Sequence, residues 1–130
     1  MTTVLFACVH NAGRSQMAAG FFNALADPAK ARAISAGTRP ADRVNPVVVE
    51  AMRDAGIDVS AERPKLLTPE LAREAQWLIT MGCGDECPLI PGVTRDDWPL
   101  DDPAGQPLER VRAIRDEIRS RVEELLETLR

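Results

Sequence analysis

The sequence has no excess of basic residues, no long apolar run and no internal repeat. Sixteen Lys and Arg stand against 20 Asp and Glu, which gives a net charge of −4. This balance argues against nucleic-acid binding, because proteins that bind nucleic acids usually carry a basic patch. No apolar run reaches the roughly 20 residues that a membrane helix needs. With 130 residues, of which 45% are hydrophobic, the chain is expected to fold as one domain over residues 1–130.

Cysteine and histidine are also scarce, at three Cys and one His. An odd number of cysteines argues against a static disulfide framework, and this set lacks the paired spacing of a usual zinc site. We therefore expect no metal and no cofactor. Met1-Thr2-Thr3 leads straight into an apolar segment, without the basic stretch of a signal peptide. We expect a cytoplasmic location, where thiols are reduced at rest and any disulfide is transient and catalytic.

Short apolar segments alternate with amphipathic ones along the chain. Strands are expected at 3–7, 31–36, 77–81 and 94–98. Helices are expected from 15 to 26, from 46 to 55, from 69 onward and from 108 to 129. This alternation predicts an α/β fold with a single four-stranded parallel sheet flanked by helices. In such sheets ligands bind at the carboxyl ends of the strands.

The first and last helices each show an apolar face. The first is expected to bury Met17, Phe21, Phe22 and Leu25. The last carries a longer stripe, formed by Leu108, Val111, Ile114, Ile118, Val122, Leu125 and Leu129. A helix with such a stripe is expected to pack across the sheet.

Between the first strand and the first helix lies the pattern Cys8-x5-Arg14-Ser15. Successive N–H groups of such a loop can curl around an anion, and the positive end of the helix points at the same spot. Arg14 can bind two oxygens at once. The expected oxyanion-binding residues are Val9, His10, Asn11, Ala12, Gly13, Arg14 and Ser15. The same positive surroundings favour the thiolate of Cys8, which makes it a nucleophile.

Taken alone, the Cys-x5-Arg spacing is weak, and a buried structural cysteine beside a surface arginine is the alternative. His10 can act as a general base, but a loop residue that offers its backbone N–H is the favoured interpretation. Asn11 tolerates a left-handed backbone and is expected to brace the loop. Ser15 is expected to donate a hydrogen bond to the Cys8 thiolate.

Cys8-x5-Arg14-Ser15 near the N-terminus, with Asp102-Pro103 far downstream, resembles the low-molecular-weight tyrosine phosphatase superfamily over almost the whole chain. The resemblance implies the fold of that superfamily and a general-acid role for Asp102. A carboxylic acid beside a bound anion is suited to protonating a leaving oxygen. The alternative for Asp101-Asp102-Pro103 is a plain surface turn.

Cys83, Cys87 and the segments Ser35-Ala36-Gly37 and Val44-Asn45-Pro46 resemble a narrower group, the arsenate reductases built on this fold. The resemblance implies that Cys8 attacks arsenate, for which phosphate or sulfate is a mimic. Asp102 protonates the departing oxygen, Cys83 attacks the Cys8 adduct, and arsenite leaves. Cys87 then resolves the Cys8–Cys83 disulfide. Residues four apart on a helical turn lie about 6 Å apart at Cα, within disulfide range. Unconnected structural cysteines are the alternative.

Two departures from the family pattern affect the expected partners. Only three residues separate Cys83 from Cys87, a shorter gap than in better-known members. The electron donor is therefore expected to be thioredoxin or a low-molecular-weight thiol with a glutaredoxin-like partner. Ala19 and Lys65 stand where some members bind potassium through carboxylates. Our hypothesis is that the Lys65 ammonium replaces the ion, so that potassium leaves the rate unchanged.

Three functions remain as hypotheses at this stage. The first is arsenate reduction in arsenic detoxification, by a monomer. The second is a tyrosine phosphatase that uses Cys8, Arg14 and Asp102 alone. Against it, the chain has no Tyr and no aromatic residues in the turn after Asp102, where phosphatases of this family usually stack a phosphotyrosine ring. The third is a non-enzymatic oxyanion sensor, which the complete set of nucleophile, arginine and acid disfavours.

Overall fold

The computed structural model describes residues 1–82 and 90–129. Its four strands are β1 (Thr2–Cys8), β2 (Ala31–Gly37), β3 (Trp77–Thr80) and β4 (Thr94–Asp97). Its helices are α1 (Arg14–Leu25), α2 (Pro46–Asp54), α3 (Pro69–Arg73) and α4 (Leu108–Thr128). Wherever an end was expected, these bounds agree with it to within one residue.

The strands form one parallel sheet in the order β2-β1-β3-β4. The central strand β1 is apolar from Val4 to Cys8 and buried over that range, because neighbouring strands and helices cover it on every side. The register pairs Cys8 with Gly37 and Ala7 with Thr80. The carboxyl ends of these strands therefore meet at one edge, as the sequence predicts.

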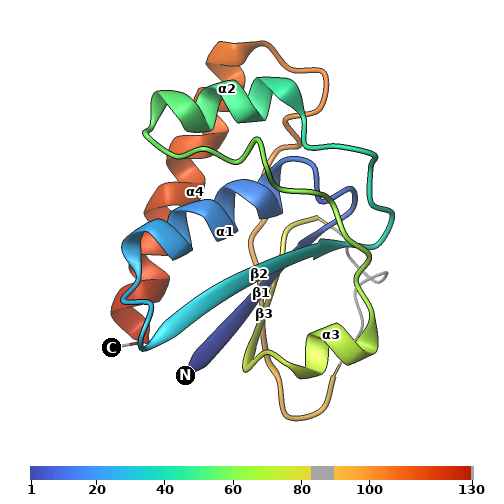
Figure 1. Ribbon diagram of the computed structural model, residues 1–130, viewed down its shortest axis with the longest axis vertical. Coiled ribbons are helices and arrows are strands. Elements are labelled where there is room, and N and C mark those ends of the chain that lie inside the picture. The colour runs from blue at the N-terminus through green and yellow to red at the C-terminus, as the bar shows by residue number, and fades with distance from the viewer. Residues whose placement is uncertain (83–89, 130) are drawn as a thin grey trace.

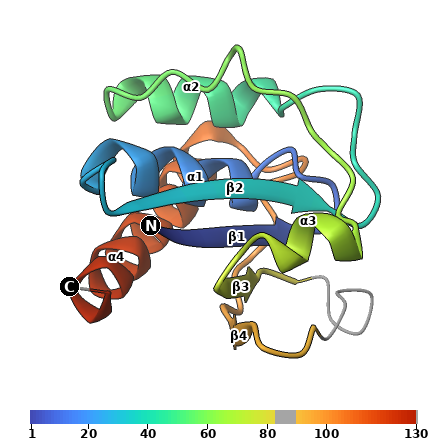
Figure 2. The ribbon, with the colours of Figure 1, turned by 60° about the horizontal axis from the view of Figure 1, so that its bottom comes forward.

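Side chains of β1 alternate between two cores. Val4, Phe6 and Cys8 pack with residues of α1, α2 and α4, whereas Leu5 and Ala7 pack on the side of α3. Figures 1 and 2 show this division, with α1, α2 and α4 gathered on one side of the strands and the short α3 on the other.

The ends of the helices follow their sequences. Asn45 caps α2 by accepting the N–H of Val47 at 2.9 Å, and Thr68 caps α3 by accepting the N–H of Leu71 at 3.1 Å. Each cap is followed by a proline at the first helical position, where its missing N–H costs no hydrogen bond.

The two predicted apolar faces are confirmed except at one end of α1. In α4 the buried residues are Val111, Ile114, Ile118, Val122 and Leu125. In α1, Met17, Phe21 and Phe22 are buried, but Leu25 is 44% exposed. The prediction for Leu25 is wrong: it is the last residue of α1, and the buried part of the helix ends at Phe22. Within the described residues, no helix combines the length and apolar character that crossing a membrane requires.

Candidate active site

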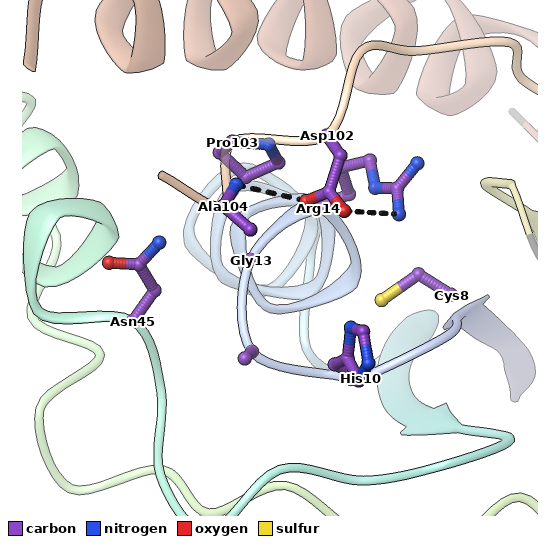
Figure 3. Close-up of a pocket in the computed structure, with 9 residues that line it drawn as sticks. Cys8, His10, Gly13, Arg14, Asn45, Asp102, Pro103 and Ala104 are labelled. Carbon is purple, nitrogen blue, oxygen red and sulfur yellow. Dashed lines mark hydrogen bonds and ion pairs between the residues drawn. The ribbon is translucent and has the colours of Figure 1, made fainter. Parts of the chain in front are cut away.

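The loop from Val9 to Gly13 brings Cys8 and Arg14 into one cavity. Cys8 ends β1 and is 2% exposed, and Arg14 begins α1 and is 8% exposed. Both line a cavity of about 30 Å³, together with His10, Asp102 and other residues. Figure 3 shows the Cys8 sulfur and the Arg14 guanidinium facing this space from neighbouring sides.

The backbone carbonyl groups of the loop accept hydrogen bonds from the segment that follows β2. The carbonyl oxygens of Val9, His10 and Ala12 accept N–H groups of residues 39, 41 and 45 at 2.8–3.0 Å. The N–H groups from Val9 to Gly13 find no acceptor among the described residues. In the described part of the chain, no side chain caps the N-terminus of α1 either. Because backbone N–H groups in folded proteins are nearly always paired, this array is suited to binding an anion.

A chain of hydrogen bonds leads from the loop to the sulfur of Cys8. Asn11 has a positive φ of 51°. Its Oδ1 accepts the backbone N–H of Lys65 at 3.0 Å, and its Nδ2 donates to Ser15 Oγ at 2.7 Å. A backbone N–H can only donate, which fixes the orientation of the Asn11 amide. Ser15 accepts from Asn11, which leaves its own proton for Cys8 Sγ at 2.9 Å. This direction suits a thiolate, which accepts but does not donate.

Gly37, in the Ser35-Ala36-Gly37 segment, permits the loop to lie close to β2. A Cβ at this position would lie 2.6 Å from the carbonyl oxygen of Val9 and 2.8 Å from the N of Asn11. These separations are far inside van der Waals contact, so a larger residue would displace the loop. The segment therefore has a packing function in building the site.

The Arg14 guanidinium is held from three directions. Its Nη1 donates to the Leu100 carbonyl at 3.3 Å, and its Nη2 lies 3.7 Å from Asp102 Oδ2. Gly82, two residues after β3, lies against the guanidinium. Its φ is +95°, and a Cβ at this position would lie only 2.5 Å from Nη1. The arginine is thus oriented before any ligand binds.

Asp102 lies in a turn that rests on the loop of residues 9–13, which we call the anion loop. Its Oδ1 accepts the N–H of Ala104 at 3.0 Å, and its side chain is 50% exposed. The neighbouring Pro103 is buried and packs against Gly13, where a Cβ would lie 2.6 Å from Pro103 Cγ. Glycine at 13 thereby lets the Asp102-Pro103 turn approach the loop, and places the carboxyl group at the cavity edge (Figure 3).

The structure thus brings together three of the five catalytic residues expected from the sequence, Cys8, Arg14 and Asp102. Cys83 and Cys87 lie outside the described residues. His10 is exposed at the mouth of the cavity, and Figure 3 draws its ring beside Cys8.

Sequence reasoning missed Asn45 and Ala104, which line the cavity, and Leu100, which binds Arg14. Asn45 lines the cavity, and its backbone N–H binds the Ala12 carbonyl at 2.8 Å. The Val44-Asn45-Pro46 segment was the available signal, because it matched the family without an assigned role. Leu100 contributes its backbone carbonyl group to Arg14, and a backbone contact of this kind leaves no signal in the sequence.

Ala19 and Lys65 line a second cavity of about 210 Å³ behind the loop. The Lys65 side chain is exposed, and its described contact with the loop is the backbone hydrogen bond to Asn11. Asp58 lines the same cavity, and hydrogen bonds from the side chain and backbone of Ser60 lower the pKa of its carboxyl group. The replacement of potassium by the Lys65 ammonium stays a prediction.

Fold and site together define an α/β protein in which a cysteine at the tip of the first strand and an arginine at the start of the first helix line one cavity. Residues 3–130 match the model of the low molecular weight phosphotyrosine protein phosphatases, and the chain belongs to this family.

Its relatives in this family include arsenate reductases. Arsenate reductase 2 of Staphylococcus haemolyticus is 35% identical over 126 residues, which cover 93% of each chain. A structure described as an arsenate reductase in the phosphate binding state is 34% identical, with a TM-score of 0.86 and full coverage of both chains. A thioredoxin-dependent arsenate reductase of Corynebacterium glutamicum is 38% identical, with a TM-score of 0.84. That match covers 99% of this chain but 61% of the longer C. glutamicum chain.

Proposed function

We propose that this chain is an arsenate reductase that converts arsenate to arsenite, and that it acts in arsenic detoxification as a cytoplasmic, single-domain monomer. The observation that carries the proposal is the cavity shared by Cys8, Arg14 and Asp102. Identity of 34–38% to arsenate reductases, over nearly the whole chain, supports arsenate as the substrate.

Arsenate binds in this proposal to the N–H groups of the loop and to the Arg14 guanidinium. The anion is attracted locally, because the net charge of the chain is −4 and does not favour anions at a distance. Phosphate and sulfate have the same tetrahedral shape and are expected to compete for the same donors.

The first chemical step is attack of the Cys8 thiolate on arsenic. A sulfur–arsenic bond forms, an arsenic–oxygen bond breaks, and Asp102 supplies a proton so that the oxygen leaves as water. The Ser15 proton stabilises Cys8 before the attack, as its distance of 2.9 Å from Sγ supports.

The second step transfers two electrons to arsenic. The Cys83 thiolate attacks the Cys8 sulfur, the sulfur–arsenic bond breaks toward arsenic, and arsenite leaves while a Cys8–Cys83 disulfide forms. Cys87 then attacks Cys83, which frees Cys8 and forms a Cys83–Cys87 disulfide. Gly82, which precedes Cys83 in the sequence, lies against Arg14 at the edge of the site. This supports Cys83, and not Cys87, as the second sulfur to react.

An external thiol returns the enzyme to its reduced form. Attack on the Cys83–Cys87 disulfide by a dithiol restores both thiols and oxidises the donor. The thioredoxin-dependent relative favours thioredoxin as the donor. A low-molecular-weight thiol with a glutaredoxin-like partner is the alternative that the short spacing of the two cysteines suggests.

Phosphate-ester hydrolysis is the second candidate function. It is favoured by the fact that Cys8, Arg14 and Asp102 form a complete hydrolytic set without the later cysteines. Against a phosphotyrosine substrate, none of the described residues that line the cavity is Phe or Trp, and the chain has no Tyr. We therefore expect hydrolysis of p-nitrophenyl phosphate to be a weak side activity.

One experiment separates the two functions. C83S and C87S are each compared with wild type in arsenate reduction with a donor system and in p-nitrophenyl phosphate hydrolysis. The reductase proposal predicts that multiple-turnover reduction is lost while hydrolysis is retained, because only reduction needs the second and third sulfurs. If both variants reduce arsenate at the wild-type rate, the three-cysteine mechanism is wrong.

A further inference from the structure

Gln16 contacts the anion loop from the third position of α1, and the proposed reaction does not use it. Its side chain is nearly fully buried, at 2% exposure. Its Nε2 donates to the Asn11 carbonyl oxygen at 3.1 Å and to Asn11 Oδ1 at 3.2 Å. Because both of these oxygens are acceptors, the orientation of the Gln16 amide is fixed as firmly as that of Asn11.

Asn11 is the residue on which the direction of the hydrogen-bond chain to Cys8 depends. It holds a positive φ of 51°, which is unfavourable for a residue with a Cβ and persists only where its surroundings determine it. Gln16 is bonded to both the backbone and the side chain of Asn11. It thereby couples the left-handed backbone to the amide orientation that turns Nδ2 toward Ser15.

We propose that Gln16 is a positioning residue for the Cys8 thiolate, acting through Asn11 and the Ser15 hydroxyl. It contacts neither Cys8 nor the oxyanion cavity among the described residues. This inference rests on the proposed role of Cys8 as nucleophile. If Gln16 is lost, the N–H of Lys65 alone holds Asn11 Oδ1. The Asn11 amide and its left-handed backbone are then held less firmly, and the Ser15 proton is directed to sulfur for less of the time.

Replacing Gln16 with an uncharged residue leaves the charged groups around this chain of hydrogen bonds unchanged. Arg14, Asp102 and His10 line the cavity of Cys8. Asp58, Glu62 and Lys65 line the cavity on the side of Gln16. A change in the ionisation behaviour of Cys8 in a Gln16 variant is therefore assigned to the hydrogen bonds and not to altered charge.

The test is the rate at which iodoacetamide alkylates Cys8, measured as a function of pH by mass spectrometry of the peptide that contains it. Gln16→Met keeps the length and volume of the side chain but removes the donor. We expect its pH profile to move to higher pH, and the rate at neutral pH to fall about tenfold.

Asn23→Ala is the matched control. Asn23 lies on the same helix, and its amide bonds the backbone of Ala33 in β2 at 2.8 and 3.1 Å. Its loss is expected to lower the unfolding temperature without moving the pH profile. If Gln16→Met does not fold, Gln16→Asn keeps the donor on a shorter stem and is expected to show a smaller shift in the same assay.

A double variant identifies the path. In a Ser15→Ala background, Gln16→Met is expected to cause no further shift, because the hydroxyl through which Gln16 acts is gone. An unchanged profile in the single Gln16 variants, or an equal shift with and without Ser15, would overturn the inference. Failure of the proposed function is distinguishable, since wild-type Cys8 would then react no faster than a free thiol and phosphate would not protect it.

Discussion

Gly82 follows β3 at a φ of +95°, and a Cβ there would lie 2.5 Å from Arg14 Nη1. Two separate effects are expected from Gly82→Ala. The left-handed backbone costs about 1–2 kcal/mol of stability for a residue with a Cβ. The methyl group also displaces the guanidinium, so we expect phosphate affinity, measured by calorimetric titration, to fall about tenfold or more with the loss of a bidentate contact.

Gly56→Ala separates the two effects. Gly56 has a similar φ of +85°, but a Cβ there meets nothing within 4 Å. This variant is expected to lose stability by the same backbone mechanism and to keep wild-type phosphate affinity. Equal phosphate affinity in Gly82→Ala and wild type would mean that Gly82 does not control the position of Arg14.

At the scale of a single element, the residue that caps the N-terminus of α2 also forms part of the cavity wall. Asn45 Oδ1 caps the helix by accepting the N–H of Val47, and Asn45 also lines the cavity that holds Cys8 and Arg14. Asn45→Ala is expected to lower the free energy of unfolding by about 1 kcal/mol, measured by denaturant titration. Asn45→Asp keeps an equally good cap, so stability is expected to be retained.

Asn45→Asp also separates anion binding from helix stability. The Asn45→Asp carboxylate lies at the cavity edge and repels an oxyanion, so we expect phosphate affinity to fall severalfold. Thr68→Ala, which removes the cap of α3 on the other face of the sheet, is expected to reduce stability alone. Unchanged phosphate affinity in Asn45→Asp would place Asn45 outside the anion site.

Across the whole molecule, the sequence could predict those features that depend on residues close together along the chain. The apolar run of β1, the Asn45-Pro46 and Thr68-Pro69 starts of α2 and α3, and the stripe of α4 each carry a local signal. The loop after β1 is local as well, which is why Cys8 and Arg14 could be paired in advance. Leu25 was misplaced because exposure at the end of a helix depends on how far its neighbours extend.

Contacts between distant segments could not be predicted in the same way. Gly37 under the loop, Pro103 against Gly13 and Gly82 over Arg14 each join parts of the chain that only the packed sheet brings together. Glycine in a sequence indicates flexibility and close approach equally well. At these positions only the distances to the neighbouring atoms show that close approach is the reason.

The account depends on Cys8 as the sulfur that attacks the bound oxyanion. A single-turnover reaction of reduced enzyme with arsenate, without an added donor, tests this most directly when arsenite and free thiols are both counted. Wild type is predicted to form one arsenite per chain and to keep one free thiol of its three, because two sulfurs end in a disulfide. C8S is predicted to form no arsenite and to keep both of its remaining thiols. Arsenite formation by C8S at the wild-type level, or three free thiols in wild type after arsenite has formed, would contradict the account.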